Sequence, residues 1–121
     1  MAVSGKLSLT FVEAKLTHDT EWFGKMSPFC RVKVREQTFV TKVCSGGGKS
    51  PHWNETYEID VKYLGDDLML EIDDKDMMST DMIGTAVIKL SSLCCNEGVD
   101  DWFLIQYKGR NAGKIHLRSR F

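Results

Sequence analysis

The stretch Pro28-Phe29-Cys30-Arg31-Val32-Lys33-Val34-Arg35 decides the fold class, because its second half alternates strictly between cationic and apolar residues. In an extended chain successive side chains point to opposite faces, so Val32 and Val34 share one face and the three cations share the other. A segment with one apolar and one charged face is typical of a half-buried strand. It predicts a sheet that covers a core and presents a basic outer face.

Similar apolar alternations recur along the whole chain, each bounded by Gly, Asp, Ser or Pro. No segment has the length and the 3.6-residue period of a substantial amphipathic helix, although residues 91–98 are predicted to form a single helical turn. We therefore predict an all-β fold, an eight-stranded antiparallel β-sandwich. Its expected strands are Lys6 to Glu13, Pro28 to Arg35, Thr38 to Cys44, Trp53 to Val61, Leu68 to Asp73, Met82 to Leu90, Asp101 to Tyr107 and Lys114 to Arg120.

Length and charge limit the function classes. A chain of 121 residues accommodates one hydrophobic core, so residues 1–121 are expected to form one domain. The formal net charge of −1 gives no general attraction to nucleic acid, and no nucleic-acid partner is expected. The start, MAVSGKLSLTF, lacks the apolar stretch of a signal peptide, which favours a cytoplasmic location. The cysteines are interpreted as reduced thiols: Cys30, Cys44, Cys94 and Cys95.

The glycine-rich run Gly46-Gly47-Gly48-Lys49-Ser50 resembles the end of a phosphate-binding P-loop but departs from it on both sides. Val43 occupies the place of the first glycine, and Pro51 follows where the motif requires a helix. A flexible turn between two strands is the better interpretation. No serine, cysteine or lysine lies in a recognisable nucleophile context such as Gly-x-Ser-x-Gly, so we predict a protein without catalytic residues.

Two connections, His18 to Ser27 and Asp74 to Gly84, are long for hairpin loops and carry both acidic and large apolar residues. The second contains Asp74, Asp76 and Asp81, whose carboxylates repel one another unless solvent or a cation separates them. An oxygen-rich acidic loop suits calcium, whereas a solvated hairpin loop is the simpler alternative. We expect the function to reside in these two loops.

Several further motifs follow one another in a recognisable order. They are Gly24-Lys25-Met26-Ser27-Pro28-Phe29, similar to G-x-x-D-P-Y; Ser50-Pro51-His52-Trp53-Asn54-Glu55, similar to N-P-x-W-N-E; the Asp-x-Asp loop that ends in Ile83-Gly84; and Trp102-Phe103-Leu104 followed by Gly113 to Leu117, similar to W-x-x-L and G-x-I-x-L. From Lys6 to the C-terminus the sequence thus resembles the C2 domain family, and within it the small single-domain plant elicitor-responsive proteins. The resemblance implies a C2-like β-sandwich with the type II order of strands.

This resemblance also implies a calcium site between the loops His18 to Ser27 and Asp74 to Gly84, which correspond to the first and third loops of the family. A lipid phosphate would complete the coordination of the metal there. The ligand positions fall on Glu21, Ser27, Asp74, Asp76 and Asp81. Ser27 lacks a charge that helps to bridge two ions in relatives, so one weakly bound calcium ion is predicted. Two ions and no ion are the alternatives, and Asp19 is placed to compensate in part for the missing charge.

The tips of the two acidic loops are apolar, with Trp22 and Phe23 in the first and Met77 and Met78 in the third. Exposed apolar area is unfavourable for an isolated monomer. These side chains therefore either fold back on the core, which is the common fate of an aromatic residue, or enter a membrane.

The basic face of the second strand offers another contact with lipid. Arg31, Lys33 and Arg35, with Lys42 on the next strand, resemble the patch with which some C2 domains bind phosphoinositides. A basic face that is merely solvated is the alternative.

Together these features predict a calcium-dependent module that is cytoplasmic and reversibly associated with membranes, its partner being an anionic or zwitterionic phospholipid surface. The alternative is a calcium-independent C2 domain that binds a protein partner, or phosphoinositides through its basic strand. Ser27, which weakens the calcium site, is the best support for that alternative.

Overall fold

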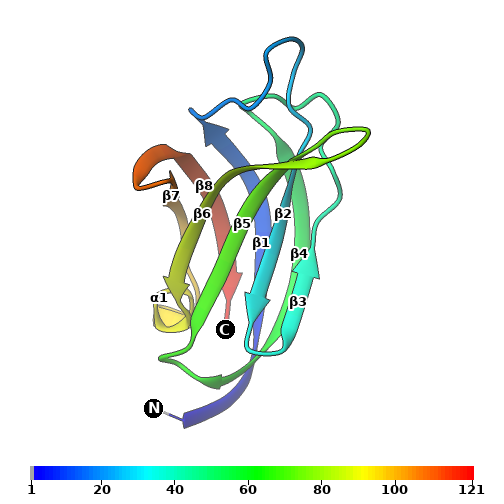
Figure 1. The fold of residues 1–121 in the computed structure, drawn as a ribbon. Helices are drawn as coiled ribbons and strands as arrows, with labels where there is room; N and C mark the ends of the chain where they lie inside the picture. Colours follow the sequence, from blue (N-terminus) through cyan, green and yellow to red (C-terminus); the bar gives the residue numbers. More distant parts are fainter. Residues whose placement is uncertain (1) are drawn as a thin grey trace.

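Eight antiparallel strands form the protein in the computed structural model, which describes residues 2–121, with Ala2 and Val3 described by their backbone only. The fold prediction is confirmed (Figure 1). The elements in chain order are β1 (Ala2–Leu16), β2 (Pro28–Val34), β3 (Gln37–Val40), β4 (His52–Tyr63), β5 (Asp67–Lys75), β6 (Thr80–Lys89), α1 (Leu90–Cys94), a 3-10 turn (Cys95–Glu97), β7 (Asp100–Tyr107) and β8 (Arg110–Arg120).

The strands follow the order β3-β2-β5-β6-β7-β8-β1-β4, and the sheet folds over on itself to make two layers. The chain passes from one layer to the other between β6 and β7, which pair only at Thr85 and Gln106 among the described residues. At the opposite margin the layers are linked by side chains, because the Gln37 amide donates to the Asp60 carbonyl (2.9 Å) and accepts from the Asp60 N–H (2.8 Å). The type II assignment of this strand order remains a prediction.

The core lies between the two layers; every strand except β3 contributes a buried apolar side chain, and β3 packs the partly buried Phe39 against it. Its largest fully buried side chains are Phe11, Leu7, Leu9, Met26, Ile59, Leu68, Leu70, Ile72, Ile83, Leu90, Leu93 and Ile105. Val32 and Val34 are buried, whereas Arg31 and Lys33 are exposed, as the alternation on β2 predicts. This burial is the main source of the fold's stability.

Several strands are longer than expected, among them β1 and β8, and two other differences change the loop end of the fold. The third strand ends at Val40 and not at Cys44, because the Thr41 hydroxyl accepts the Cys30 N–H (2.9 Å) and so interrupts the regular ladder. The third acidic loop is much shorter than expected. β5 and β6 extend into it through the pairs Asp74–Asp81 and Lys75–Thr80, so that only residues 76–79 form the turn.

The loops that carry the acidic residues leave the same end of the sandwich (Figure 1). Trp53 secures this end, since its indole N–H donates to the Pro28 carbonyl (3.1 Å) and joins β4 to the start of β2. The left-handed backbone of Asn54 (φ 51°) accompanies an irregularity in the pairing of β4 with β1. The helical turn expected at residues 91–98 is present as α1 and the 3-10 turn, and no helix among residues 2–121 is long and apolar enough to cross a bilayer.

Candidate functional site

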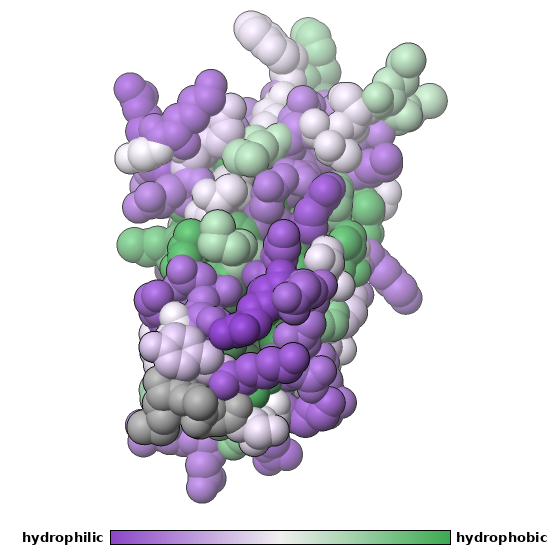
Figure 2. All heavy atoms as spheres, turned by 60° about the horizontal axis from the view of Figure 1, so that its bottom comes forward, coloured by the Kyte–Doolittle hydropathy of each residue, from purple (hydrophilic) through white to green (hydrophobic). Residues whose placement is uncertain are grey.

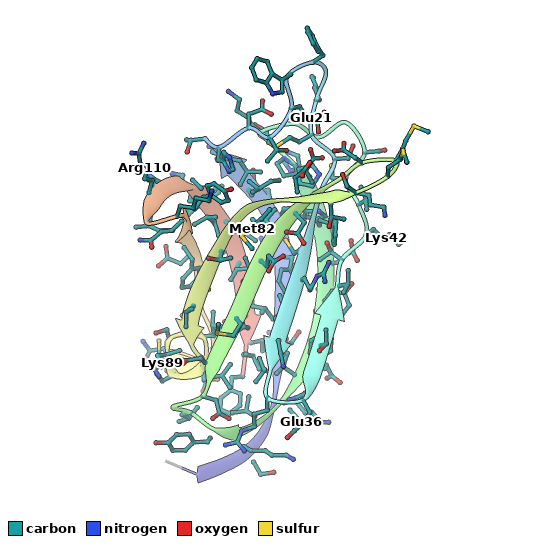
Figure 3. The ribbon with its side chains drawn as sticks, in the orientation of Figure 1. Glu21, Glu36, Lys42, Met82, Lys89 and Arg110 are labelled. Atoms are coloured by element: carbon teal, nitrogen blue, oxygen red, sulfur yellow. The ribbon has the colours of Figure 1, made fainter. Side chains whose placement is uncertain are left out.

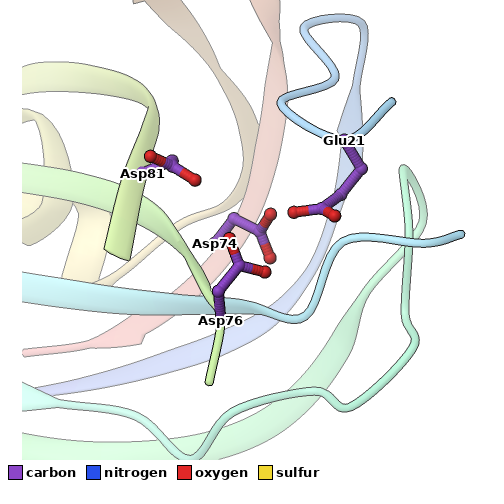
Figure 4. A group of neighbouring side chains, drawn as sticks. All are labelled: Glu21, Asp74, Asp76 and Asp81. Carbon is purple, nitrogen blue, oxygen red and sulfur yellow. The ribbon is translucent and has the colours of Figure 1, made fainter. Parts of the chain in front are cut away.

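Four carboxylates from the β1–β2 loop and the β5–β6 hairpin meet at the loop end. Glu21 lies in the β1–β2 loop, Asp74 near the end of β5, Asp76 in the β5–β6 turn and Asp81 near the start of β6. One carboxylate oxygen of each lies within 4.8 Å of the others (Figure 4). The structure thus brings together four of the five residues predicted as metal ligands.

Asp74 is the buried member of this group and is firmly held. The Thr20 hydroxyl donates to its Oδ2 (2.7 Å) and the Ser27 N–H donates to its Oδ1 (2.7 Å). Burial acts to raise the pKa of Asp74, but the hydrogen bonds from Glu21, Ser27 and Thr20 outweigh it and hold this pKa below its usual value. Asp74 is therefore the anionic anchor of the site.

Crowding raises the pKa values of two other carboxylates, Glu21 and Asp81. Hydrogen bonding to Asp74, followed by burial and a hydrogen bond with Asp76, raises the pKa of Glu21 to about 7. The pKa of Asp81 is also raised, chiefly by its hydrogen bond with Asp76. Near neutral pH the cluster thus shares protons to limit its repulsion, and a bound cation could take their place.

A bulge in the β5–β6 ladder creates part of this crowding. The register shifts by one residue between Ile72 and Asp73, so that Asp74 directly faces Asp81 across the two strands. Like charges that face each other across a sheet are destabilising. Such a pair breaks the local rules of sheet design, which is expected at a functional site.

The donor set suits calcium. Each of the four carboxylates offers a hard oxygen atom from a loop or a strand end, and calcium takes six to eight oxygens with loose geometry. The cluster contains no sulfur or imidazole donor, the ligands that zinc prefers. Calcium binding by these residues remains a prediction.

Ser27 has a positioning contact besides its predicted role as a ligand. Its N–H holds Asp74, and its hydroxyl accepts the N–H of Gly46 (3.1 Å). Asp19, considered as a compensating ligand, accepts the Glu21 N–H through its Oδ1 (3.0 Å) and shapes the loop on which Glu21 lies. Thr20 was not foreseen, because its contact with Asp74 depends on the folding of the loop.

Both apolar tips are fully in water. Trp22 is 95% exposed and Phe23 is 90% exposed, while Met77 and Met78 reach 102% and 97%. None of these four side chains folds back on the core, the alternative considered above. Side chains from the two loops project from the upper end of the molecule, the end at which Glu21 lies (Figures 2 and 3).

Acidic side chains pair with part of the predicted phosphoinositide patch. Arg31 Nη2 lies 3.4 Å from Asp73 Oδ2, and Arg35 pairs with Asp66. Burial, followed by the neighbouring Glu71, raises the pKa of Asp73 to about 7. The groove over β2, β5 and β6 that contains Arg31, Lys33 and Arg35 also contains Asp67 and Glu71, so its positive charge is largely offset.

Lys42 does not lie on the strand where it was expected, since β3 ends at Val40. Its backbone N–H donates to the Glu55 carboxylate, at 3.0 Å for the shorter contact. The binding of phosphoinositides by Arg31, Lys33, Arg35 and Lys42 remains a prediction.

Comparison with known proteins identifies the family. Residues 5–105 match the model of the C2 domain. The chain belongs to the C2 domain family. Elicitor-responsive protein 3 of rice (Oryza sativa subsp. japonica) is 33% identical over 92 residues, which cover 75% of this C2 domain chain and 64% of the rice protein. The chain therefore spans slightly less than two thirds of that relative.

Extended synaptotagmins are also similar. Human extended synaptotagmin-2 is 31% identical over 121 residues, which cover 94% of this chain but only 13% of that protein. A solved structure of the C2A and C2B domains of extended synaptotagmin 2 in the calcium-bound state superposes with a TM-score of 0.83 at 30% identity, covering 99% of this chain and 46% of the other. A C2 domain protein from a putative elicitor-responsive gene superposes with a TM-score of 0.82 at 26% identity, covering 99% and 90%.

Proposed function

We propose that this C2 domain docks on phospholipid membranes when calcium binds between its first and third loops. One observation carries the proposal: four carboxylates converge within 4.8 Å directly beside two loop tips whose apolar side chains are fully exposed. A calcium-bound structure of a relative that is 30% identical supports the metal. We further propose a cytoplasmic protein that associates reversibly with membranes, without catalytic activity of its own.

The acidic cluster would act as an electrostatic switch. Without a cation its negative charge lies between the tips and repels anionic headgroups. Calcium would supply positive charge there, with Glu21, Asp74, Asp76 and Asp81 as its protein ligands. Asp74 would stay fixed by Thr20 and Ser27, while Glu21 gives up its shared proton.

The exposed tips would then supply the affinity. Complete burial of a large apolar side chain is worth about 1.5–3 kcal/mol, so four partly inserted ones supply several kcal/mol. Trp22 suits the headgroup boundary, because its ring is apolar and its indole N–H can still bond to water or phosphate.

Liposome sedimentation with calcium and with chelator tests the proposal. We expect the protein to pellet with phospholipid vesicles in calcium and to stay in the supernatant in chelator. A variant in which Trp53 and Trp102 are replaced by Phe leaves Trp22 as its sole indole, whose emission should shift to the blue only when calcium and vesicles are both present. Binding that ignores calcium, with red emission throughout, would favour the calcium-independent alternative, in which the tips bind a protein partner.

A further inference from the structure

A second basic surface lies on the other layer of the sandwich, away from the basic strand that the sequence singles out. Two adjacent hollows share Thr17 and Asn111 and run beside the β7–β8 hairpin. Their lining includes four cations and, among the residues described, no carboxylate. These hairpin cations are Lys15, Lys108, Arg110 and Lys114.

The sheet sets two of these cations against each other. Lys15 of β1 directly faces Lys114 of β8, and the next residue across, on β7, is the exposed Leu104. Like charges in directly opposed positions cost stability. Among the side chains of residues 4–121, no carboxylate pairs with either lysine: Glu13, on the same face, lies 3.6 Å and 4.0 Å from ring nitrogens of His116 and His52.

Aromatic rings hold three of these cations without neutralising them. The ammonium groups of Lys114 and Lys15 lie 4.9 Å and 5.3 Å from the centre of the Trp102 ring. Lys108 lies 5.3 Å from the centre of the Tyr107 ring. Within residues 4–121, whose side chains are described, none of the four hairpin cations forms an ion pair, in contrast to Arg31 and Arg35 on the basic strand.

The hairpin cations also lie at the loop end. The β7–β8 turn is at the same end of the sandwich as the two acidic loops, and Arg110 projects there on the side of the molecule opposite Lys42 (Figures 1 and 3). The hairpin cations therefore lie at the same end of the sandwich as the acidic cluster and the apolar tips. A membrane reached by the tips would lie within reach of these cations if the domain tilted toward β7 and β8.

We propose that Lys15, Lys108, Arg110 and Lys114 bind the headgroups of anionic phospholipids in the docked state and give the domain its preference for anionic membranes. The uncompensated positive charge and the exposed Leu104 beside it match an anionic headgroup layer above an apolar interior. The inference rests on the proposed function, because it assigns the lipid class and the tilt of the same docked state.

The test compares two sets of four substitutions in the full chain at saturating calcium. One variant replaces the hairpin cations by Gln, and the matched control replaces Arg31, Lys33, Arg35 and Lys42 by Gln, which removes the same charge. Each cation at an anionic surface is worth about fivefold in affinity. We expect the hairpin variant to bind vesicles containing about 30 mol% phosphatidylserine at least tenfold more weakly than wild type. The loss of affinity of the control, on a logarithmic scale, should be less than half of that.

Further measurements separate this inference from the proposed function and from other anions. Binding to pure phosphatidylcholine vesicles should be unchanged in the hairpin variant, and inorganic phosphate at matched ionic strength should not displace wild type from anionic vesicles. The double variant Lys108→Gln and Arg110→Gln, whose exposed side chains lie outside the core, should still weaken binding to anionic vesicles by about five- to twenty-fivefold. Thermal unfolding of each variant confirms that it is folded.

Three outcomes would overturn the assignment while leaving calcium-dependent docking intact. The two quadruple variants could lose affinity equally, neither could lose affinity, or wild type could bind anionic and zwitterionic vesicles equally well. If the hairpin variant still binds anionic vesicles but no longer binds an acidic peptide such as polyglutamate, the surface would be assigned to a protein partner. Failure of wild type to bind any vesicle would overturn both the assignment and the proposed function.

Discussion

The two ends of the sandwich arrange charge across neighbouring strands in opposite ways. At the end away from the loops, directly facing residues carry opposite charges. Lys6 of β1 faces Asp60 of β4, and Asp67 of β5 faces Lys89 of β6, the latter pair with an N–O distance of 2.8 Å. Such pairs favour the correct register and the folded state.

At the loop end the facing residues carry like charges. Asp74 faces Asp81, and Lys15 faces Lys114. Both arrangements cost stability in the isolated protein, and a ligand of the opposite sign would relieve each of them. The difference between the ends suits one end to stability and the other to the binding proposed above, and the following experiments would break or sharpen that contrast.

Calcium should produce the largest effect, because a ligand that binds only the folded state stabilises it by mass action. At a calcium concentration 100 times Kd the gain is about 2.7 kcal/mol, measurable as a rise in Tm that chelator reverses. Asp76→Asn should abolish the rise without loss of the apo fold, since Asp76 lies in a turn. Asp101→Asn, an exposed change on β7 that keeps an acceptor for the Trp102 N–H, is the matched control. No rise at millimolar calcium would contradict the site.

Trp22→Ala should weaken binding to vesicles by about 1–2 kcal/mol, or roughly five- to thirtyfold, if half or more of the ring is buried in lipid. Stability should be unchanged, because the ring is 95% exposed in the free protein. Met77→Ala should cost less, and Tyr63→Ala, which removes a partly exposed ring at the other end, should leave vesicle binding as in wild type. Equal binding by Trp22→Ala and wild type would show that the first loop does not insert.

Calcium affinity should rise with pH through the raised pKa of Glu21, because the metal must displace the proton that this group holds up to about pH 7. From pH 6 to pH 8 the increase should be roughly tenfold for one displaced proton. The stability of the calcium-free protein should change with pH in the opposite direction. Folding raises the pKa of Glu21, so this group stabilises the folded state fully below its unfolded pKa near 4.5, and the stabilisation is lost as pH rises through about 7. Isothermal titration calorimetry in two buffers checks the proton release.

Glu21→Gln is the control for this pH dependence. Asp73 also has a pKa raised to about 7, by burial and by Glu71, and contributes to the stability of the calcium-free protein with the same sign. The Gln variant should therefore lose most of the pH dependence of calcium binding and only part of the pH dependence of stability. An unchanged calcium profile would exclude Glu21 as the group that releases the proton.

Charge reversals across the strands should have the smallest effects, about 0.2–1 kcal/mol, with opposite signs at the two ends. Asp81→Lys removes a like-charge pair and should stabilise the calcium-free protein while it abolishes the response to calcium. Lys89→Asp creates a like-charge pair with Asp67 and should destabilise, leaving the calcium response unchanged. Chemical denaturation measures both; shifts of the same sign would remove the contrast between the ends.

Local patterns carried most of the fold and the acidic residues Asp74, Asp76 and Asp81, whereas Glu21 and Ser27 became ligand candidates through the resemblance to the C2 domain family. The alternation at Arg31 to Arg35 was enough to orient β2, because side chains in a strand must alternate between the faces of the sheet. The same locality explains the errors: the end of β3 depends on a hydroxyl of Thr41 that competes for the Cys30 N–H, and the length of the third loop depends on pairing between β5 and β6.

The sequence by itself determined which residue types lie in which loop, and hence an acidic, apolar-tipped C2 domain; only the tertiary structure decided which charges face one another. Two bulges make the difference. Without the shift between Phe11 and Glu13 in β1, Lys15 would face Gly113 and not Lys114, and without the shift after Ile72, Asp74 would face Met82 and not Asp81. A slip of one residue moves every side chain of a strand to the other face, and this register is set by turns, bulges and core packing across the whole sheet, which no local pattern contains.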